Sequence, residues 1–151
     1  MGKDHGCGRV IWPQGGSHLL DPDINTNPYE LGLDRLVNTE IEADFIGKAA
    51  LKRIRDAGVS RKQVGLKIDC APLQGPNTSF WPLGLGEKTV GKVTSAVYSP
   101  RLKQNIALAM VDATCTEIGT VLEVITAAGS AQATVVERPF FDPKKKIAVA
   151  A

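Results

Sequence analysis

Side chains that could transfer protons, attack a carbon atom or hold a metal are few in this sequence and widely spaced. Two histidines and a cysteine near the start, His5, Cys7 and His18, lack the paired spacing of zinc ligands, so no metal site is predicted. No Gly-rich loop with a Lys opens a helix, and no Ser lies in a nucleophile elbow beside a general base. The residues alone therefore predict no self-contained active site, and no catalytic residue is assigned.

Closely spaced carboxylates occur in the stretch TEIEAD, at Glu40, Glu42 and Asp44. We interpret them as negative charge at a helix start, which the helix dipole stabilises, rather than as an acid–base pair. Asp44 is a good helix cap, and Gly58 supplies a left-handed stop. Between them the spacing predicts a helix with basic residues toward water and one apolar stripe, made of Ile46, Ala50, Leu51 and Ile54.

The bulk composition is that of an ordinary globular domain. The chain has 151 residues, 43% of them hydrophobic, and a formal net charge of +2, so no global field favours nucleic acid or an anionic membrane as a partner. Three cysteines, far apart and odd in number, fit reduced thiols. No basic leader with an apolar core opens the chain and no apolar run could span a bilayer, so we expect a cytoplasmic protein.

The chain from Lys62 onward predicts strands. Short stretches rich in β-branched residues, KQVGLKI, KTVGKVTSAVYS, QNIALAMV, GTVLEVIT and QATVVER, are separated by Gly, Pro, Asn and Asp. Five or six strands without long helices between them favour an antiparallel barrel or sandwich. Leu122, Val124 and Thr126 form the core face of one strand, and Val121, Glu123 and Ile125 the other. Apolar residues in Tyr29–Val37 predict one further strand before the helix.

The stretch GKVTSAVYSPRLKQNIALAMV, residues 91–111, predicts two strands joined by a tight corner. Gly91 permits a bend or bulge, and Val93, Ser95 and Val97 alternate with Thr94, Ala96 and Tyr98 as in a pleated strand. Pro100 fixes one backbone angle of the corner, and the Asn105 side chain can bond to backbone in the turn. The fold alone explains each of these residues, so we interpret the stretch first as structural and not as an active site.

Five motifs in this order carry a family resemblance: NPYELGLDRLVN, DFIGKAALKRI, GKVTSAVYSPRLKQNIALAMV, GTVLEV and VVERPFFDP. Over about residues 25–143 the chain resembles the C-terminal part of the folate-dependent aminomethyltransferase family. That family includes the T protein of glycine cleavage, the folate domains of sarcosine and dimethylglycine dehydrogenases, and the dimethylsulfoniopropionate demethylases. The sequences of the motifs LDRLV and PFFDPKK resemble the demethylase-like branch most closely.

The resemblance implies a division of the chain. Residues 1–24 are expected to be a poorly ordered or divergent leader, 25–60 a strand and helix left from the preceding folate-binding domain, 61–143 the C-terminal β-barrel, and 144–151 a tail. The predicted fold is thus mainly β, an antiparallel barrel of about six strands in a Greek-key or jelly-roll-like arrangement, preceded by a strand and one α-helix. Family members are more than twice this length, and their folate-binding core precedes these motifs.

The resemblance also implies candidate binding residues. In the family the barrel closes one side of the folate tunnel, so Arg35, Tyr98, Ser99 and Arg101 are expected to line a shared concave face and contact tetrahydrofolate. Arg35 stands where glycine cleavage members usually have Trp, which removes an aromatic surface, although a guanidinium can stack or bind an anion. Residues 12–16, WPQGG, stand where the family usually has a folate-facing Arg.

Two functions follow as hypotheses. The first is a C-terminal fragment of a tetrahydrofolate-dependent aminomethyl- or methyltransferase that helps enclose the folate site and is inactive alone. The second is a non-catalytic barrel that associates with itself or with a full-length relative. Either a missing N-terminal folate-binding core or a second copy is the expected partner, since removing a large neighbouring domain exposes apolar surface and favours a dimer or larger assembly.

Overall fold

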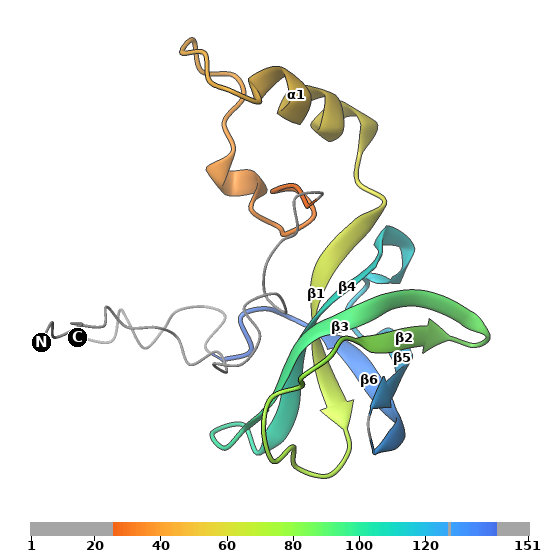
Figure 1. The fold of residues 1–151 in the computed structure, drawn as a ribbon. Helices are drawn as coiled ribbons and strands as arrows, with labels where there is room; N and C mark the ends of the chain where they lie inside the picture. Colours follow the sequence, from red (N-terminus) through yellow and green to blue (C-terminus); the bar gives the residue numbers. More distant parts are fainter. Residues whose placement is uncertain (1–25, 127, 142–151) are drawn as a thin grey trace, which may run out of the picture.

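A computed structural model describes residues 26–126 and 128–141 (Figure 1). A lobe of residues 26–60 lies at one end of a β-barrel and leads directly into its first strand. The predicted leader and tail, and with them His5, Cys7 and His18, lie outside the described residues. In chain order the elements are η2 (Asp34–Leu36), α1 (Lys48–Ala57), β1 (Arg61–Asp69), β2 (Trp81–Leu85), β3 (Lys88–Ser99), β4 (Gln104–Asp112), η3 (Ala113–Cys115), β5 (Val121–Thr126) and β6 (Gly129–Val136).

The six strands form a closed barrel in the order β1-β4-β3-β2-β5-β6, and every neighbouring pair is antiparallel. β2, β3 and β4 follow one another as hairpins, while β1 lies beside β4 instead of β2, which is a Greek-key connection. The predicted barrel of about six strands is confirmed. Closure leaves no strand edge unpaired, which removes a common route to aggregation.

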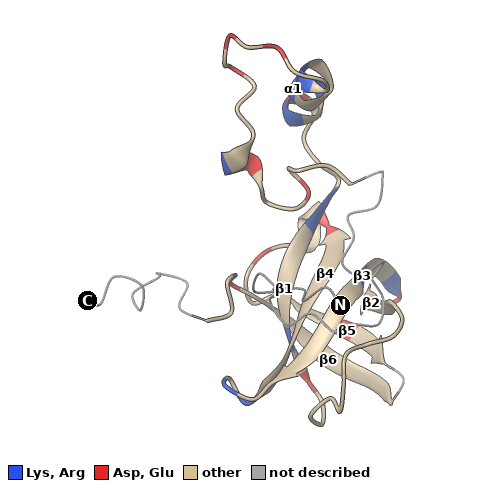
Figure 2. Ribbon diagram, turned by 60° about the vertical axis from the view of Figure 1, so that its left-hand side comes forward, with Lys and Arg blue, Asp and Glu red and all other residues tan. Residues whose placement is uncertain are grey.

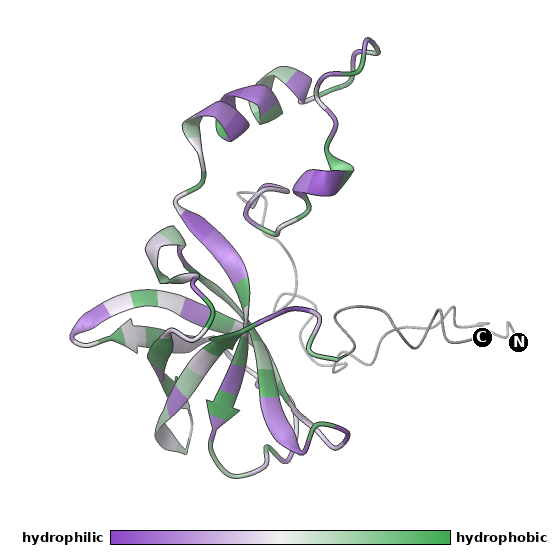
Figure 3. Ribbon diagram, turned by 180° about the vertical axis from the view of Figure 1, so that it is seen from behind, coloured by the Kyte–Doolittle hydropathy of each residue, from purple (hydrophilic) through white to green (hydrophobic). Residues whose placement is uncertain are grey.

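The core consists of inward-facing side chains from all six strands, and the strands of Figure 3 alternate between hydrophobic and hydrophilic bands accordingly. Leu122 and Val124 of β5 are buried, and Val121 and Ile125 are exposed, as predicted. In β3 simple alternation is wrong, because a bulge between Val93 and Ser95 shifts the register. The bulge places Tyr98 opposite Asn105 of β4.

The predicted strand at residues 29–37 is wrong: this part of the lobe is a series of turns followed by the short helix η2. The side-chain oxygen of Asn27 accepts bonds from the backbone N–H groups of Tyr29 and Glu30, both at 3.1 Å. Gly32 then takes a positive φ of 72°, which a strand residue does not adopt. Local side-chain bonding therefore overrides the apolar spacing.

The predicted helix exists but begins later than expected. Its N-cap is Gly47, and Asp44 instead accepts a bond from the N–H of Phe45 at 3.0 Å, three residues before the cap. The stop at Gly58 is confirmed, with a φ of 76°. Figure 2 shows acidic residues along the loop that precedes α1 and basic residues on the helix. No helix among the described residues has both the length and the apolar character needed to cross a membrane.

Candidate functional site

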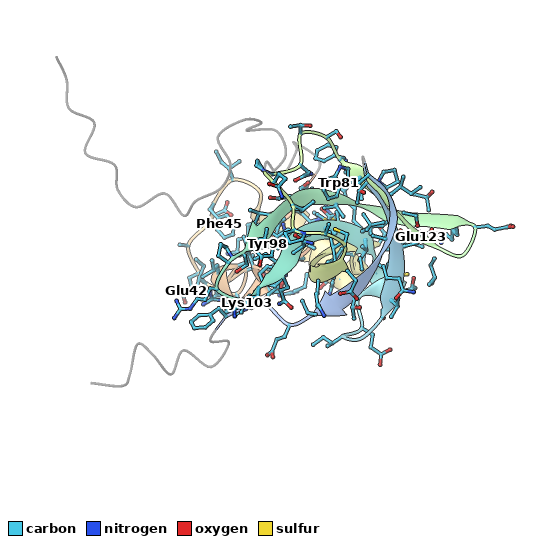
Figure 4. All side chains as sticks on the ribbon, turned by 90° about the horizontal axis from the view of Figure 1, so that it is seen from below. Glu42, Phe45, Trp81, Tyr98, Lys103 and Glu123 are labelled. Atoms are coloured by element: carbon cyan, nitrogen blue, oxygen red, sulfur yellow. The ribbon has the colours of Figure 1, made fainter. Side chains whose placement is uncertain are left out.

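The corner between β3 and β4, residues 98–104, is a hairpin turn at the barrel end away from the lobe (Figure 1). Tyr98 and Ser99 close the end of β3, pairing with Asn105 and Gln104 of β4. The Ser99 hydroxyl oxygen accepts a bond from the Leu102 N–H at 3.3 Å, which stabilises the turn. Viewed from below, Tyr98 and Lys103 mark this end of the barrel (Figure 4). Three of the four predicted binding residues therefore lie in one turn.

Asn105 fastens the loop that follows β1 to this corner. Its side chain is 2% exposed; its amide donates to the carbonyl oxygens of Cys70 at 2.9 Å and Ala71 at 3.1 Å. Its side-chain oxygen accepts from the Leu73 N–H at 3.0 Å. The sequence predicted that this side chain bonds to backbone in its own turn, but its partners are more than 30 residues away.

Asn77 makes a second attachment between the loop and the barrel. It is buried, and its side-chain oxygen accepts a bond of 2.6 Å from the Ala96 N–H of β3. Its own backbone N–H donates to the Ala96 carbonyl oxygen at 3.3 Å. Two buried asparagines thus hold residues 70–80 against β3 and β4. No sequence signal identified Asn77, because a loop asparagine is expected to be exposed.

The charge at the corner comes from Arg101 and Lys103. Both are exposed, and no ion pair among the described residues involves either one. The Arg101 guanidinium lies 3.8 Å from the centre of the Phe141 ring, a cation–π contact that orients it. This arrangement can receive an anionic group, because its positive charge is not neutralised.

Cys70 lies next to this corner but is not suited to nucleophilic attack. Burial, reinforced by the negative charge of Asp69, raises the pKa of its thiol. The thiolate is the reactive form, so a raised pKa lowers reactivity. Among the described residues no group of three His, Cys, Asp or Glu side chains is placed to hold a metal ion.

Arg35 does not join the other three predicted residues. It is exposed on η2 in the lobe, which enters the barrel where Arg61 pairs with Asp112. The corner lies at the other end of β1, where Ile68 pairs with Asn105. The two halves of the predicted site are therefore separated by the length of a strand.

Glu30 joins the lobe to the barrel and was not identified from the sequence. Its carboxylate is buried and forms a 2.8 Å ion pair with Arg61, and its carbonyl oxygen accepts from the Gln63 N–H at 2.7 Å. A buried, paired carboxylate fixes relative position, because separating it from its partner leaves an uncompensated charge.

Two clefts of about 470 and 600 Å³ lie at this junction, and a third of about 480 Å³ is lined by residues of the lobe alone. None is lined by Arg35, Tyr98, Ser99 or Arg101. The first lies between the lobe and η3, and Tyr29 lines it. The Tyr29 hydroxyl is the buried side-chain polar atom without a hydrogen-bond partner among the described residues.

Comparison with known proteins matches the barrel to a family. Residues 61–142 match the family described as the glycine cleavage T-protein C-terminal barrel domain. The aminomethyltransferase of Synechococcus sp. (strain CC9902) is 40% identical over 126 residues, covering 82% of this chain and 34% of that protein. The aminomethyltransferase of Symbiobacterium thermophilum is 43% identical over 117 residues, covering 76% and 30%.

A solved structure agrees with these matches. The crystal structure of glycine cleavage system aminomethyltransferase T from Bartonella henselae superposes with a TM-score of 0.70 at 25% identity, covering 79% of this chain and 33% of that one. The chain thus spans about a third of the length of the relatives it matches. Residues 61–151 are only 91 of the 151, so a match over 76% or more of the chain extends into the lobe.

Proposed function

The chain belongs to the aminomethyltransferase family through its glycine cleavage T-protein C-terminal barrel domain, and we propose that it serves as the C-terminal domain of a tetrahydrofolate-dependent aminomethyl- or methyltransferase. The observation that carries this proposal is the match of the whole barrel together with part of the lobe. The chain spans about a third of the length of its relatives. We therefore expect this domain to form one side of a folate site whose remaining residues come from another stretch of polypeptide. The domain alone is inactive.

The corner fits the anionic end of tetrahydrofolate. When bound, tetrahydrofolate accepts the one-carbon unit that the enzyme transfers, and its glutamate tail carries carboxylates. Arg101 and Lys103 are exposed cations without ion pairs among the described residues, and the Phe141 ring orients the first of them. We assign them to the tail carboxylates, with Tyr98 and Ser99 beside them as further polar contacts.

Among the described residues, none of the three clefts offers the ring system of the folate a site at this corner. The clefts lie in the lobe or at its junction with the barrel and include none of the corner residues. Arg35 lies in the lobe, at the other end of β1 from the corner, so the proposal does not place it among the contacts to the folate tail. The proposal therefore gives this chain one edge of the folate site and leaves the rest to the preceding polypeptide.

A second candidate is a barrel without catalytic role that associates with itself or with a full-length relative. It is favoured by the exposed apolar residues of the lobe, among them Leu36 and Ile46. It predicts association but no response to folate.

An amide NMR titration with tetrahydrofolate under anaerobic conditions tests the first candidate. We expect saturable shifts at residues 98–103 that are weakened by Arg101→Gln. Arg53→Gln, which removes an exposed cation from α1, is the matched control and should leave the response unchanged. A dispersed spectrum with no change at the corner would reject folate contact by this chain and favour the second candidate.

A further inference from the structure

Arg138, which follows β6, lies across the outer side of β1. Val64 and Leu66 of this strand are buried in the core. Since successive side chains of a strand point to opposite sides, Gln63 and Gly65 lie on the outer side. A Cβ on Gly65 would lie 2.8 Å from the Arg138 Cγ, so the glycine admits the arginine stem against the backbone of the strand. The Arg138 Nη1 donates a hydrogen bond to the Gln63 side-chain oxygen, which fixes the guanidinium on this side of β1.

The positive charge of Arg138 is not neutralised within the described part of the chain. No ion pair there involves Arg138 or its neighbour across β1, Lys62. The Arg138 side chain keeps an exposed part, but partial burial of the guanidinium lowers the pKa of Arg138. The surroundings therefore disfavour the charged form, and an anion bound beside the guanidinium offsets that loss.

A cleft of about 600 Å³ lies beside this guanidinium, between the lobe and the barrel. Ligand pockets have volumes of about 300–1,000 Å³. The ionisable residues that line the cleft are Lys62, Arg138 and Glu137, two cations and one carboxylate, which leaves one positive charge in excess. Gly32 also lines it, and a Cβ there would lie 3.3 Å from the Arg138 Nη2. The missing side chain of Gly32 thus leaves space for a ligand atom next to that nitrogen.

The other walls of the cleft include apolar side chains that the protein leaves in contact with water. Leu31, Leu33 and Ile118 line it, and Leu33 is 39% exposed and Ile118 66% exposed. A ligand with a charged end at Arg138 and a hydrocarbon remainder would remove part of this apolar surface from water, which is favourable.

We propose that this cleft binds a small amphipathic monocarboxylate, with its carboxylate on Arg138 and Lys62 and its hydrocarbon part on Leu33 and Ile118. Among the described residues, the Arg138 Nε and Nη2 have no hydrogen-bond partner, and these two N–H donors match the two oxygens of a carboxylate. One negative charge also matches the single excess positive charge of the cleft. The corner assigned to the folate tail contributes no residue to this cleft, so the proposal does not rest on the proposed function.

An NMR titration of the isotopically labelled full chain with sodium hexanoate tests the proposal, with ionic strength held constant by sodium chloride. We expect saturable shifts of the Gly32 and Gln63 amide signals and of the Arg138 Nε–H. Sodium butanoate is the comparison, because it lacks two of the methylenes of hexanoate. Burying one full methylene raises affinity about fourfold, so half-burial of two should make hexanoate bind about fourfold more tightly.

Substitutions assign the carboxylate contact. Arg138→Gln should weaken hexanoate binding at least about tenfold, because it removes both paired donors and their charge. Lys62→Gln should weaken it about two- to fivefold, since an exposed ammonium acts as a point charge. Lys62 is exposed and makes no hydrogen bond among the described residues, so this variant carries the test if Arg138→Gln does not fold. Arg101→Gln, which removes a cation from the corner, is the matched control and should bind hexanoate unchanged.

Three results would overturn the proposal. The first is the absence of saturable shifts at Gly32 and Gln63 beyond those that sodium chloride alone produces. The second is an unchanged affinity in both Arg138→Gln and Lys62→Gln. The third is inorganic phosphate binding as tightly as hexanoate, because phosphate has no hydrocarbon part. The folate response is measured at residues 98–103 and this response at Gly32 and Gln63, so failure of one proposal is distinguishable from failure of the other.

Discussion

Replacing Asn105 with Ala should lower the free energy of unfolding of this protein by about 2–3 kcal/mol. The side chain makes three hydrogen bonds of 2.9 to 3.1 Å to backbone groups of the loop that follows β1 and a weaker one of 3.3 Å to the Cys70 sulfur, and it is 2% exposed. A typical hydrogen bond contributes about 1 kcal/mol, so three would contribute about 3 kcal/mol. The value is reduced because the partners, Cys70, Ala71 and Leu73, are half-buried or exposed and water can replace part of the lost bonding.

Urea unfolding of Asn105→Ala beside Gln104→Ala measures this loss. Gln104 is the half-exposed neighbour whose side chain bonds to nothing among the described residues, so its replacement should change stability by less than about 0.5 kcal/mol. Asn105→Asp should lose at least as much as Asn105→Ala, because a carboxylate accepts from the Leu73 N–H but repels two carbonyl oxygens. The proposed role of the asparagine is wrong if the free energy of unfolding of Asn105→Ala lies within about 0.5 kcal/mol of the parent value and the m value is unchanged. A loss of that size is no larger than the one expected for Gln104→Ala.

Two further predictions concern close packing and pH. Gly91→Ala should destabilise the barrel by at least about 2 kcal/mol, because a Cβ there would lie 2.2 Å from the Met110 carbonyl oxygen. Gly84→Ala, with nothing nearer than 3.6 Å, is the control, and equal urea midpoints would contradict the argument. The bond from Arg55 holds the pKa of Glu40 below its usual 4.5, so this contribution to stability is complete above pH 4.5 and is lost as pH falls through the lower folded value. The protection factors of the α1 amides, which are corrected for the intrinsic pH dependence of amide exchange, should fall as pH falls through that window and should not fall in Glu40→Gln; a fall that persists in the variant would assign it to another group.

The barrel could be predicted because its signals are local. In a strand buried on one face, apolar residues recur at every second position, so the burial of Leu122 and Val124 can be predicted from their own strand alone. The end of α1 was equally accessible, since Gly58 adopts a positive φ that other residues avoid. The start of α1 could not be predicted. The Asp44 side chain accepts a bond from the N–H of Phe45, its immediate neighbour, and no sequence pattern distinguishes such a bond from a helix cap.

The candidate site could be predicted only in part, because its members depend on pairing between distant strands. Tyr98, Ser99 and Arg101 stay together since one hairpin contains them. Arg35 is separated from them because β1 runs the length of the barrel between the lobe and the corner. The roles of Asn77, Asn105 and Glu30 could not be read from their neighbours in sequence, because the bond by which each side chain joins two parts of the fold goes to a residue at least 19 positions away.

Local periodicity and ordered motifs were enough to predict the strands of the barrel, the tight corner and the family. The pairing of β1 with β4, the bulge that sets Tyr98 opposite Asn105 and the exposure of several apolar side chains on the lobe became visible in the folded chain. The physical reason is that closing a barrel and burying a surface depend on which distant segments meet, whereas alternation and turn chemistry depend on adjacent residues alone.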